Sequence, residues 1–216
     1  GDLYLNGELI EDLVIPEDVT EIKYAAFMGS SIKTVTIHDN VTCIQSSAFS
    51  GCSELEAVYI GENVTGIMSD AFFNCTKLAS VNIPDKVSCI GSNAFSHCSS
   101  LKSVVFPESL TDLGEEAFSQ CTGLESVVVN DGLKSLPKSL FLGCSKLMSI
   151  KIPASVTKIN SRAIPVRTTN NVTIYGVTDS VAHTFAKSNS CPFVDYTVVS
   201  TPAENIVIKE DRYVSS

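Results

Sequence analysis

A repeat of 22 or 23 residues constrains this 216-residue chain more than any other feature of its sequence. One unit is too small to bury its own apolar face, so neighbouring units must stack and share a core. Stacking places each recurring residue above its counterpart and turns each column into a continuous apolar ladder. We therefore predict a solenoid with about seven units over residues 10–175. The aligned columns are Ala26, Ala48, Ala71, Ala94 and Ala117, each followed by Phe; Cys52, Cys75, Cys98, Cys121 and Cys144; and Leu55, Leu78, Leu101, Leu124 and Leu147.

Three segments of each unit have distinct local patterns. An apolar-x-apolar triplet such as Val58-Tyr59-Ile60 predicts a short strand whose outer residues point inward and whose middle residue points outward. The Val-Thr-x-Ile pattern predicts a second short strand on another side of the coil. The Ala-Phe-x-x-Cys segment is too short for a stable helix, so we expect a helical or 3-10 turn there. Strands of successive units should be parallel, about 4.8 Å apart, in a right-handed and mainly β coil.

The two ends of the repeat array differ from its middle and are predicted to be caps. Apolar residues on both sides of Asn6-Gly7 predict a hairpin that covers the first unit, as a cap at residues 1–10. The segment "DSVAHTFAKSN" predicts a short helix with Asp179 or Ser180 as its N-cap. An extended lid, "CPFVDY", follows and completes a helix-strand cap at residues 176–195. We therefore predict one repeat domain over residues 1–195, with residues 196–216 as a tail or the start of a following segment.

The repeat resembles a known family. The unit "CSELEAVYIGENVTGIMSDAFFN" is similar to the BspA-like (Treponema-type) leucine-rich repeats, with their Cys, Leu, Val-Thr, Ile and Ala-Phe positions. The resemblance covers about residues 1–195 and is specific for the fold. It implies a leucine-rich-repeat solenoid, a secreted or cell-surface location in a bacterium, and a non-enzymatic role in adhesion or protein binding. We find no signal peptide within residues 1–216 but expect Gly1-Asp2 to be a trimmed start, so the expected location rests on this resemblance alone.

Composition and motif spacing argue against several other classes of protein. The net charge of −9 argues against a nucleic-acid or anionic-membrane partner, and no apolar run approaches the roughly 20 residues of a membrane span. The three histidines, His38, His97 and His183, share no metal-ligand spacing, and there is no nucleophile elbow or phosphate-binding loop. We expect no enzymatic activity, no catalytic residues, no cofactor and a monomeric protein.

Eight cysteines raise the question of disulfides or a metal. The five in the repeat column are odd in number and lack Cys-x-x-Cys spacing, so a row of small buried thiols is the better interpretation. Cys43 and Cys89 belong to another column that also holds charged residues, and we expect both to meet solvent.

A column of acidic residues follows the first strand of most units. Two interpretations are open for it: acidic residues are common in exposed turns, and carboxylate oxygens also suit Ca²⁺. The second interpretation gives a weak hypothesis of a divalent-cation edge at Glu62, Asp85 and Glu108. The whole column is Glu17, Asp39, Glu62, Asp85, Glu108 and Asp131.

The outward residues of the first strands form the candidate binding surface. Tyr59, Asn82, Val105 and Val128 stand at its centre, beside a row of small residues, and the column continues to Lys151 and Thr173. Exposed valines on adjacent units favour contact with a protein or glycan ligand. Two alternatives remain: this side is merely solvated, or the protein is a structural spacer that holds other domains and binds nothing.

Overall fold

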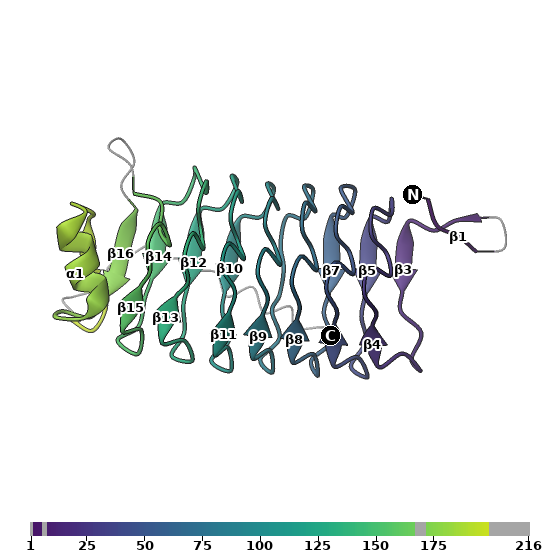
Figure 1. Ribbon diagram of the computed structural model, residues 1–216, viewed down its shortest axis with the longest axis horizontal. Coiled ribbons are helices and arrows are strands. Elements are labelled where there is room, and N and C mark those ends of the chain that lie inside the picture. The colour runs from purple at the N-terminus through teal and green to yellow at the C-terminus, as the bar shows by residue number, and fades with distance from the viewer. Residues whose placement is uncertain (1, 6–7, 167–171, 199–216) are drawn as a thin grey trace.

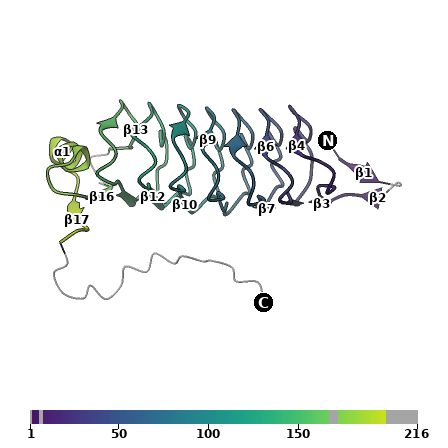
Figure 2. The ribbon, with the colours of Figure 1, turned by 90° about the horizontal axis from the view of Figure 1, so that it is seen from below.

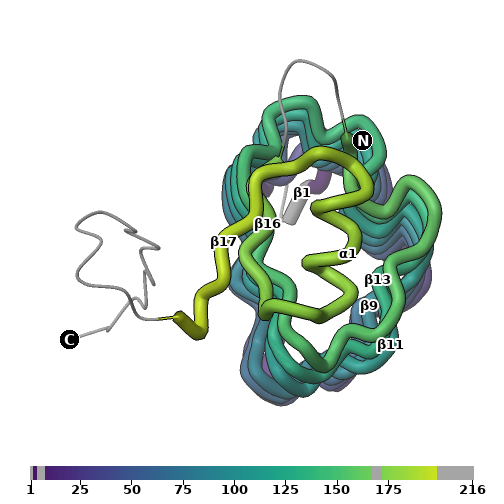
Figure 3. Tube along the Cα trace, turned by 90° about the vertical axis from the view of Figure 1, so that its left-hand side faces the viewer, coloured from purple at the N-terminus to yellow at the C-terminus, as the bar shows by residue number. Residues whose placement is uncertain are grey.

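The computed structural model describes residues 2–5, 8–166 and 172–198. Its chain winds into a long stack of coils, here called rungs, that runs from the β1 end to the α1 end (Figure 1). Viewed along the stack, successive rungs lie almost directly over one another (Figure 3). The predicted leucine-rich-repeat type of solenoid, with short parallel strands, is confirmed.

The outward triplets form the first side of the stack. Their strands pair in parallel and in register, so that Thr36 lies opposite Tyr59 and Val105 opposite Val128. Two sheets result, one of three strands and one of five. The strands of the first sheet are β3 (Asp12–Val14), β5 (Thr34–Thr36) and β7 (Ala57–Tyr59), and those of the second are β10 (Ser103–Val105), β12 (Ser126–Val128), β14 (Ser149–Lys151), β16 (Thr173–Gly176) and β17 (Phe193–Asp195).

The predicted strand between these two sheets is absent, which corrects the expectation for the triplet at Val81. Residues 79–84 form no strand, and Val81 is only half buried. The hydrogen bonds on either side are long, at 3.4 Å from Ala79 N to Glu56 O and 3.3 Å from Lys102 N to Ala79 O. The solenoid continues through this rung, but its strand ladder is interrupted.

The Val-Thr-x-Ile segments form the second side. Their hydroxyls reinforce the backbone ladder: Thr65 Oγ1, for example, donates to Thr42 O at 3.2 Å in the preceding rung. Two parallel sheets result, with strand orders β11-β9-β8-β6-β4 and β13-β15. These strands are β4 (Glu21–Ile22), β6 (Cys43–Ile44), β8 (Gly66–Ile67), β9 (Cys89–Ile90), β11 (Asp112–Leu113), β13 (Ser135–Leu136) and β15 (Lys158–Ile159).

The Ala-Phe segments form turns with the i→i+3 hydrogen bonds of a 3-10 turn. Ala48 N donates to Gln45 O at 3.2 Å and Cys52 N to Phe49 O at 3.1 Å. Alternate amides bond to the next rung instead, as from Phe49 N to Ala71 O at 2.8 Å. Left-handed residues such as Ser47, with φ 60°, interrupt the segment, so no continuous helix forms in the described turns.

Phenylalanine rings stack through the centre of the solenoid. Phe27, Phe49, Phe72, Phe95 and Phe118 follow one another with ring centroids 5.1 to 5.3 Å apart and planes within 8 to 11° of parallel. The Ala, Cys and Leu columns around them are buried from the second rung onward. The repeat therefore produces one continuous core, as a chain of small units requires.

The buried thiols are hydrogen-bonded to the backbone. Cys75 Sγ donates to Phe49 O, and Cys98 Sγ to Phe72 O, each at 3.3 Å. All eight cysteines are free in the described structure. A small side chain that donates to a buried carbonyl suits this column, because an unpaired buried polar group is costly.

These thiols are expected to react in a definite order. Burial raises the pKa of Cys98 to about 12 and also raises the pKa of Cys75, which keeps both as unreactive thiols. Cys43 and Cys89 are only partly buried. A thiol reagent should therefore label Cys43 and Cys89 in the native protein before Cys75 or Cys98, with unfolding releasing the rest. Mass spectrometry would contradict this by detecting a Cys75–Cys98 disulfide.

The N-terminal hairpin forms as predicted but leaves part of the first rung open. Strands β1 (Tyr4–Leu5) and β2 (Glu8–Leu9) pair antiparallel, and the connecting residues 6–7 lie outside the described residues. The hairpin points away from the stack along its long axis (Figures 1 and 2). A groove of about 390 Å³ remains at the first rung, with Ile15, Val19 and Phe27 in its wall.

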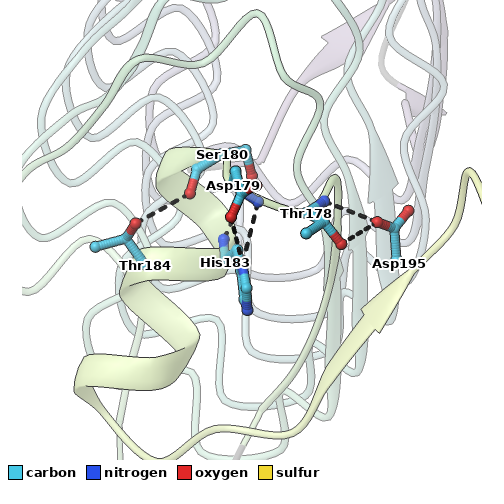
Figure 4. Close-up of polar contacts among 6 residues, drawn as sticks. All are labelled: Thr178, Asp179, Ser180, His183, Thr184 and Asp195. Atoms are coloured by element: carbon cyan, nitrogen blue, oxygen red, sulfur yellow. Dashed lines mark hydrogen bonds and ion pairs between the residues drawn. The ribbon is translucent and has the colours of Figure 1, made fainter.

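The C-terminal cap closes the other end. Helix α1 (Val181–Ser188) lies across the last rungs (Figure 3), with Ala182 and Ala186 buried against them. Ser180 is the N-cap, and its hydroxyl accepts from His183 N at 3.3 Å. The carboxylate of Asp195 in β17 accepts from the backbone N–H and the hydroxyl of Thr178 (Figure 4).

Hydrogen bonds from Thr178 and Thr197 hold the pKa of Asp195 well below its usual range.

Among the described residues, no helix has both the length and the apolar character that a membrane span requires. The boundary after residue 195 stays a prediction, because most of the predicted tail, residues 199–216, lies outside the described residues.

Candidate functional site

The four predicted binding residues lie on what we call the strand face. It is the outward side of strands β3, β5, β7, β10, β12, β14, β16 and β17 and of the strandless rung at residues 79–84 between β7 and β10. Tyr59 ends β7 and Val105 ends β10, and each is 49% exposed. Val128, at the end of β12, is half buried. Asn82 is exposed but lies in the rung without a strand. The fold thus places Tyr59, Val105 and Val128 in one strand-end column, with Asn82 in the gap between them.

The C-terminal part of the strand face differs from the sequence prediction. Lys151 lies opposite Tyr175, whereas Thr173 lies opposite Ser149, so Tyr175 continues the outward column instead of Thr173. The interval from Lys151 to Tyr175 is longer than the 22 or 23 residues of the repeat, and the sequence prediction therefore placed Thr173 in this column. Val172 and Ile174 are both buried, and this alternation of buried residues was the signal for the correct register.

Tyr196 was not predicted as a part of this surface. The chain leaves β17 and brings the Tyr196 ring over the ammonium group of Lys151, 4.9 Å from the ring centroid. Tyr196 N donates to Gly176 O at 3.1 Å, which fixes the backbone at this point. No repeat column contains Tyr196, so no sequence pattern indicated that it would return to the strand face.

The two edges of the strand face carry charge differently. On the edge where the strands begin, Lys33 pairs with Glu11 at 2.8 Å and Lys102 with Glu125 at 3.8 Å. On the opposite edge stand the six carboxylates predicted from the sequence, and none of them forms an ion pair with a described residue. We call this second row the acidic edge: Glu17, Asp39, Glu62, Asp85, Glu108 and Asp131.

The acidic edge also has a role in the turns. Asp39 Oδ1 accepts a hydrogen bond from Glu62 N at 2.8 Å, so a carboxylate of one rung holds the turn of the next. Its charge reaches the strand face: partial burial raises the pKa of Tyr59, and the charges of Asp39 and Glu62 raise it further. Two carboxylates that form no ion pair with a described residue therefore act on the half-exposed Tyr59 ring.

The calcium hypothesis for the acidic edge stays a prediction. Among the described residues, no three His, Cys, Asp or Glu side chains are grouped closely enough to hold a metal ion together. If Glu62, Asp85 and Glu108 share calcium, millimolar Ca²⁺ should raise the melting temperature, because the ion would bind only the folded state. The pair of changes Glu62→Gln and Asp85→Asn should then abolish the rise. An unchanged melting temperature in Ca²⁺ would assign these residues to the turns alone.

The histidines lie in separate parts of the fold. His38 Nε2 is 2.5 Å from Pro16 O in a post-strand turn. The His97 ring meets Phe73 edge-on, and His183 packs on Phe193 within the cap. Each has a local structural contact, and the fold brings none of them near another.

Together, the stacked rungs and the exposed sheet define a repeat solenoid that presents a broad, regular surface. Six copies of the BspA type leucine rich repeat region match residues 3–88 and 65–191, and the chain belongs to this family. No curated protein matches the chain.

Two solved structures show the same architecture. A leucine-rich repeat protein from Bacteroides ovatus is 29% identical, with a TM-score of 0.61, over 78% of this chain and 48% of that one. The present chain thus spans about half the length of that protein. The T. pallidum leucine-rich repeat protein TpLRR is 26% identical, with a TM-score of 0.65, over 86% of each chain.

Proposed function

We propose that this protein is a non-enzymatic binding module that acts in adhesion at a bacterial surface, and that it binds a protein through the strand face. The family and the solenoid support a role in protein interaction. The secreted or cell-surface location comes from the resemblance to BspA-like proteins, and adhesion is the function that fits such a location. A glycan ligand is the alternative on the same surface.

The observation that carries this proposal is the partly exposed column of Tyr59, Val105 and Val128, in which Val105 and Val128 lie on paired parallel strands and Tyr59 lies two rungs away. The strands hold neighbouring side chains in a fixed relation, so little conformational entropy is lost on binding. Tyrosine is enriched at interface hot spots because it combines apolar area with a hydroxyl. Half-exposed apolar residues at this regular spacing offer a partner contact area without prior rearrangement.

Replacing Tyr59 by Ala should weaken binding of an identified partner by at least about 1 kcal/mol. The melting temperature should stay nearly unchanged, because the ring lies outside the core. Thr157→Ala is the control: its hydroxyl bonds to Lys134 O on the Val-Thr-x-Ile side, so the change should leave binding intact. Calorimetric titration measures both variants.

Unchanged binding by the Tyr59→Ala variant would remove the strand face from the proposal. A broad screen against host matrix proteins, mucins and glycans supplies the partner for this test. If that screen yields no partner, the structural spacer becomes the better account of the protein.

A further inference from the structure

The strand face already holds one cation against an aromatic ring. The Lys151 ammonium group lies 4.9 Å from the centroid of the Tyr196 ring and forms no ion pair with a described residue. Asp131, the last carboxylate of the acidic edge, is close enough for its charge to add to the burial that raises the pKa of Tyr196. One end of the face thus combines a tyrosine ring, a carboxylate and a lysine.

Tyr59 has similar surroundings without the cation. The pairing of Thr36 with Tyr59 places Asp39 and Glu62 three residues further along their strands, at the same edge of the sheet. The hydrogen bond from Glu62 N to Asp39 Oδ1 joins these two turns. The Tyr59 ring is half exposed, so a partner can reach it.

The lysines nearest to this part of the fold are engaged elsewhere. Lys33 lies at the opposite edge of the face in its ion pair with Glu11. The Lys86 ammonium group donates to Asn63 Oδ1 at 2.6 Å on the turn side. Neither Asp39 nor Glu62 forms an ion pair within the described structure. Lys86 lines the same turn-side hollow as Asp39 but donates to Asn63, so the two carboxylates beside Tyr59 have no direct basic partner among the described residues.

We propose that Tyr59, Asp39 and Glu62 receive a lysine or arginine side chain from a partner protein whose apolar residues lie on Val105 and Val128. This inference rests on the proposed function and specifies the chemistry of the partner. A cation over a tyrosine ring is attracted by the ring quadrupole, and the flanking carboxylates add charge complementarity. Arginine fits best, because its planar guanidinium stacks on a ring while donating to carboxylates.

The spacing also defines the partner. Tyr59 and Val105 are two rungs apart, or about 10 Å at the usual distance between paired strands. An extended polypeptide covers that distance in about three residues. The partner segment therefore carries a basic residue and an apolar residue about three positions apart. The net charge of −9 favours the approach of such a segment.

Two probe peptides test the proposal. One has arginine three residues from a valine on each side, and the other has citrulline, a neutral analogue of nearly the same shape, in place of arginine. Each is titrated into isotope-labelled protein at low salt and followed by NMR up to millimolar concentrations. We expect the arginine peptide to shift signals of Tyr59 and Val105, and the citrulline peptide to bind about threefold to fivefold more weakly.

Three variants locate the origin of that preference. Asp39→Asn with Glu62→Gln removes the charges while keeping the acceptor for Glu62 N. Tyr59→Leu keeps apolar area but removes the ring. Both should make the two peptides bind equally. Glu115→Gln with Glu116→Gln, in a turn away from the strand face, removes the same number of charges and should leave the preference intact.

Every other outcome overturns the proposal. One such outcome is that the unaltered protein binds the two peptides equally, or binds neither at millimolar concentration. Another is that its preference for the arginine peptide survives the Tyr59→Leu change or the combined Asp39→Asn and Glu62→Gln changes. A neutral oligosaccharide that requires Tyr59 but not the two carboxylates would assign the face to glycans. If both peptides bind equally and Val105→Ser weakens both, the strand face is a binding surface but does not select a cation. That result contradicts this inference and leaves the proposed function standing.

Discussion

Replacing Phe95 by Ala should lower the free energy of unfolding by about 3–5 kcal/mol, the usual range for a fully buried phenylalanine. The ring has no exposed surface and stacks between Phe72 at 5.2 Å and Phe118 at 5.1 Å. Its removal leaves a cavity that stiff neighbouring rungs can fill only in part. Urea-induced unfolding gives the free energy directly.

The same change should loosen the rungs next to Phe95 more than the ends of the stack, because each rung contacts only its neighbours. Hydrogen exchange resolves this by rung. Phe73→Ala is the control, since Phe73 is only half buried and lies outside the central ring stack, packing edge-on with His97. A loss below about 1 kcal/mol for Phe95→Ala would show that the ring does not hold the core together.

Gly114→Ala should also be strongly destabilising, with a loss of about 1–3 kcal/mol in the free energy of unfolding. A Cβ at Gly114 would stand 2.2 Å from Ser92 N and 2.5 Å from Gly91 C in the preceding rung. Those atoms belong to the backbone, so the clash can be relieved only by moving one rung against another. Thermal and urea unfolding both measure the loss.

Gly51→Asn is the control, because Gly51 is needed for its backbone conformation and Gly114 for close packing between rungs. Gly51 has φ 74°, and a Cβ there would meet the Gly29 backbone only at van der Waals distances of 3.7 and 3.8 Å. Asn74 occupies the same position of the next rung with φ 58°. Asparagine tolerates this left-handed conformation, so the change should cost less than about 1 kcal/mol. If Gly114→Ala lowers the free energy of unfolding no more than Gly51→Asn does, the backbones of the two rungs do not approach each other closely at Gly114.

The core could be predicted from the sequence because the repeat imposes it. Equivalent residues must adopt the same conformation in every rung for the units to stack, so a column such as Val104 and Val127 becomes a register pair. The same reasoning placed Tyr59, Val105 and Val128 on one surface. The outward direction of these side chains follows from the two-residue period of a strand.

Features that break the repeat could not be predicted in this way. The rung of Asn82 keeps the apolar repeat positions Val81 and Ile83, yet its strand ladder is interrupted, with hydrogen bonds of 3.4 and 3.3 Å on either side. Tyr175 and Tyr196 follow a longer final interval, and only the folded chain brings Tyr196 over Lys151. Ion pairs such as Lys33–Glu11 form on the edge where the strands begin and, among the described residues, not on the acidic edge. This difference likewise depends on how far side chains reach between rungs.

Saturation transfer from a bound partner to the valine and threonine methyl groups of this protein tests the central claim most directly. The protein is deuterated except at those methyls, and the partner comes from the binding screen. We predict attenuation at Val105 and Val128 on the strand face, with the Thr65 and Thr111 methyls of the Val-Thr-x-Ile side unaffected. Attenuation at Thr65 and Thr111, or at Val181 in the cap helix, without any at Val105 would contradict the assignment of the strand face as the binding surface.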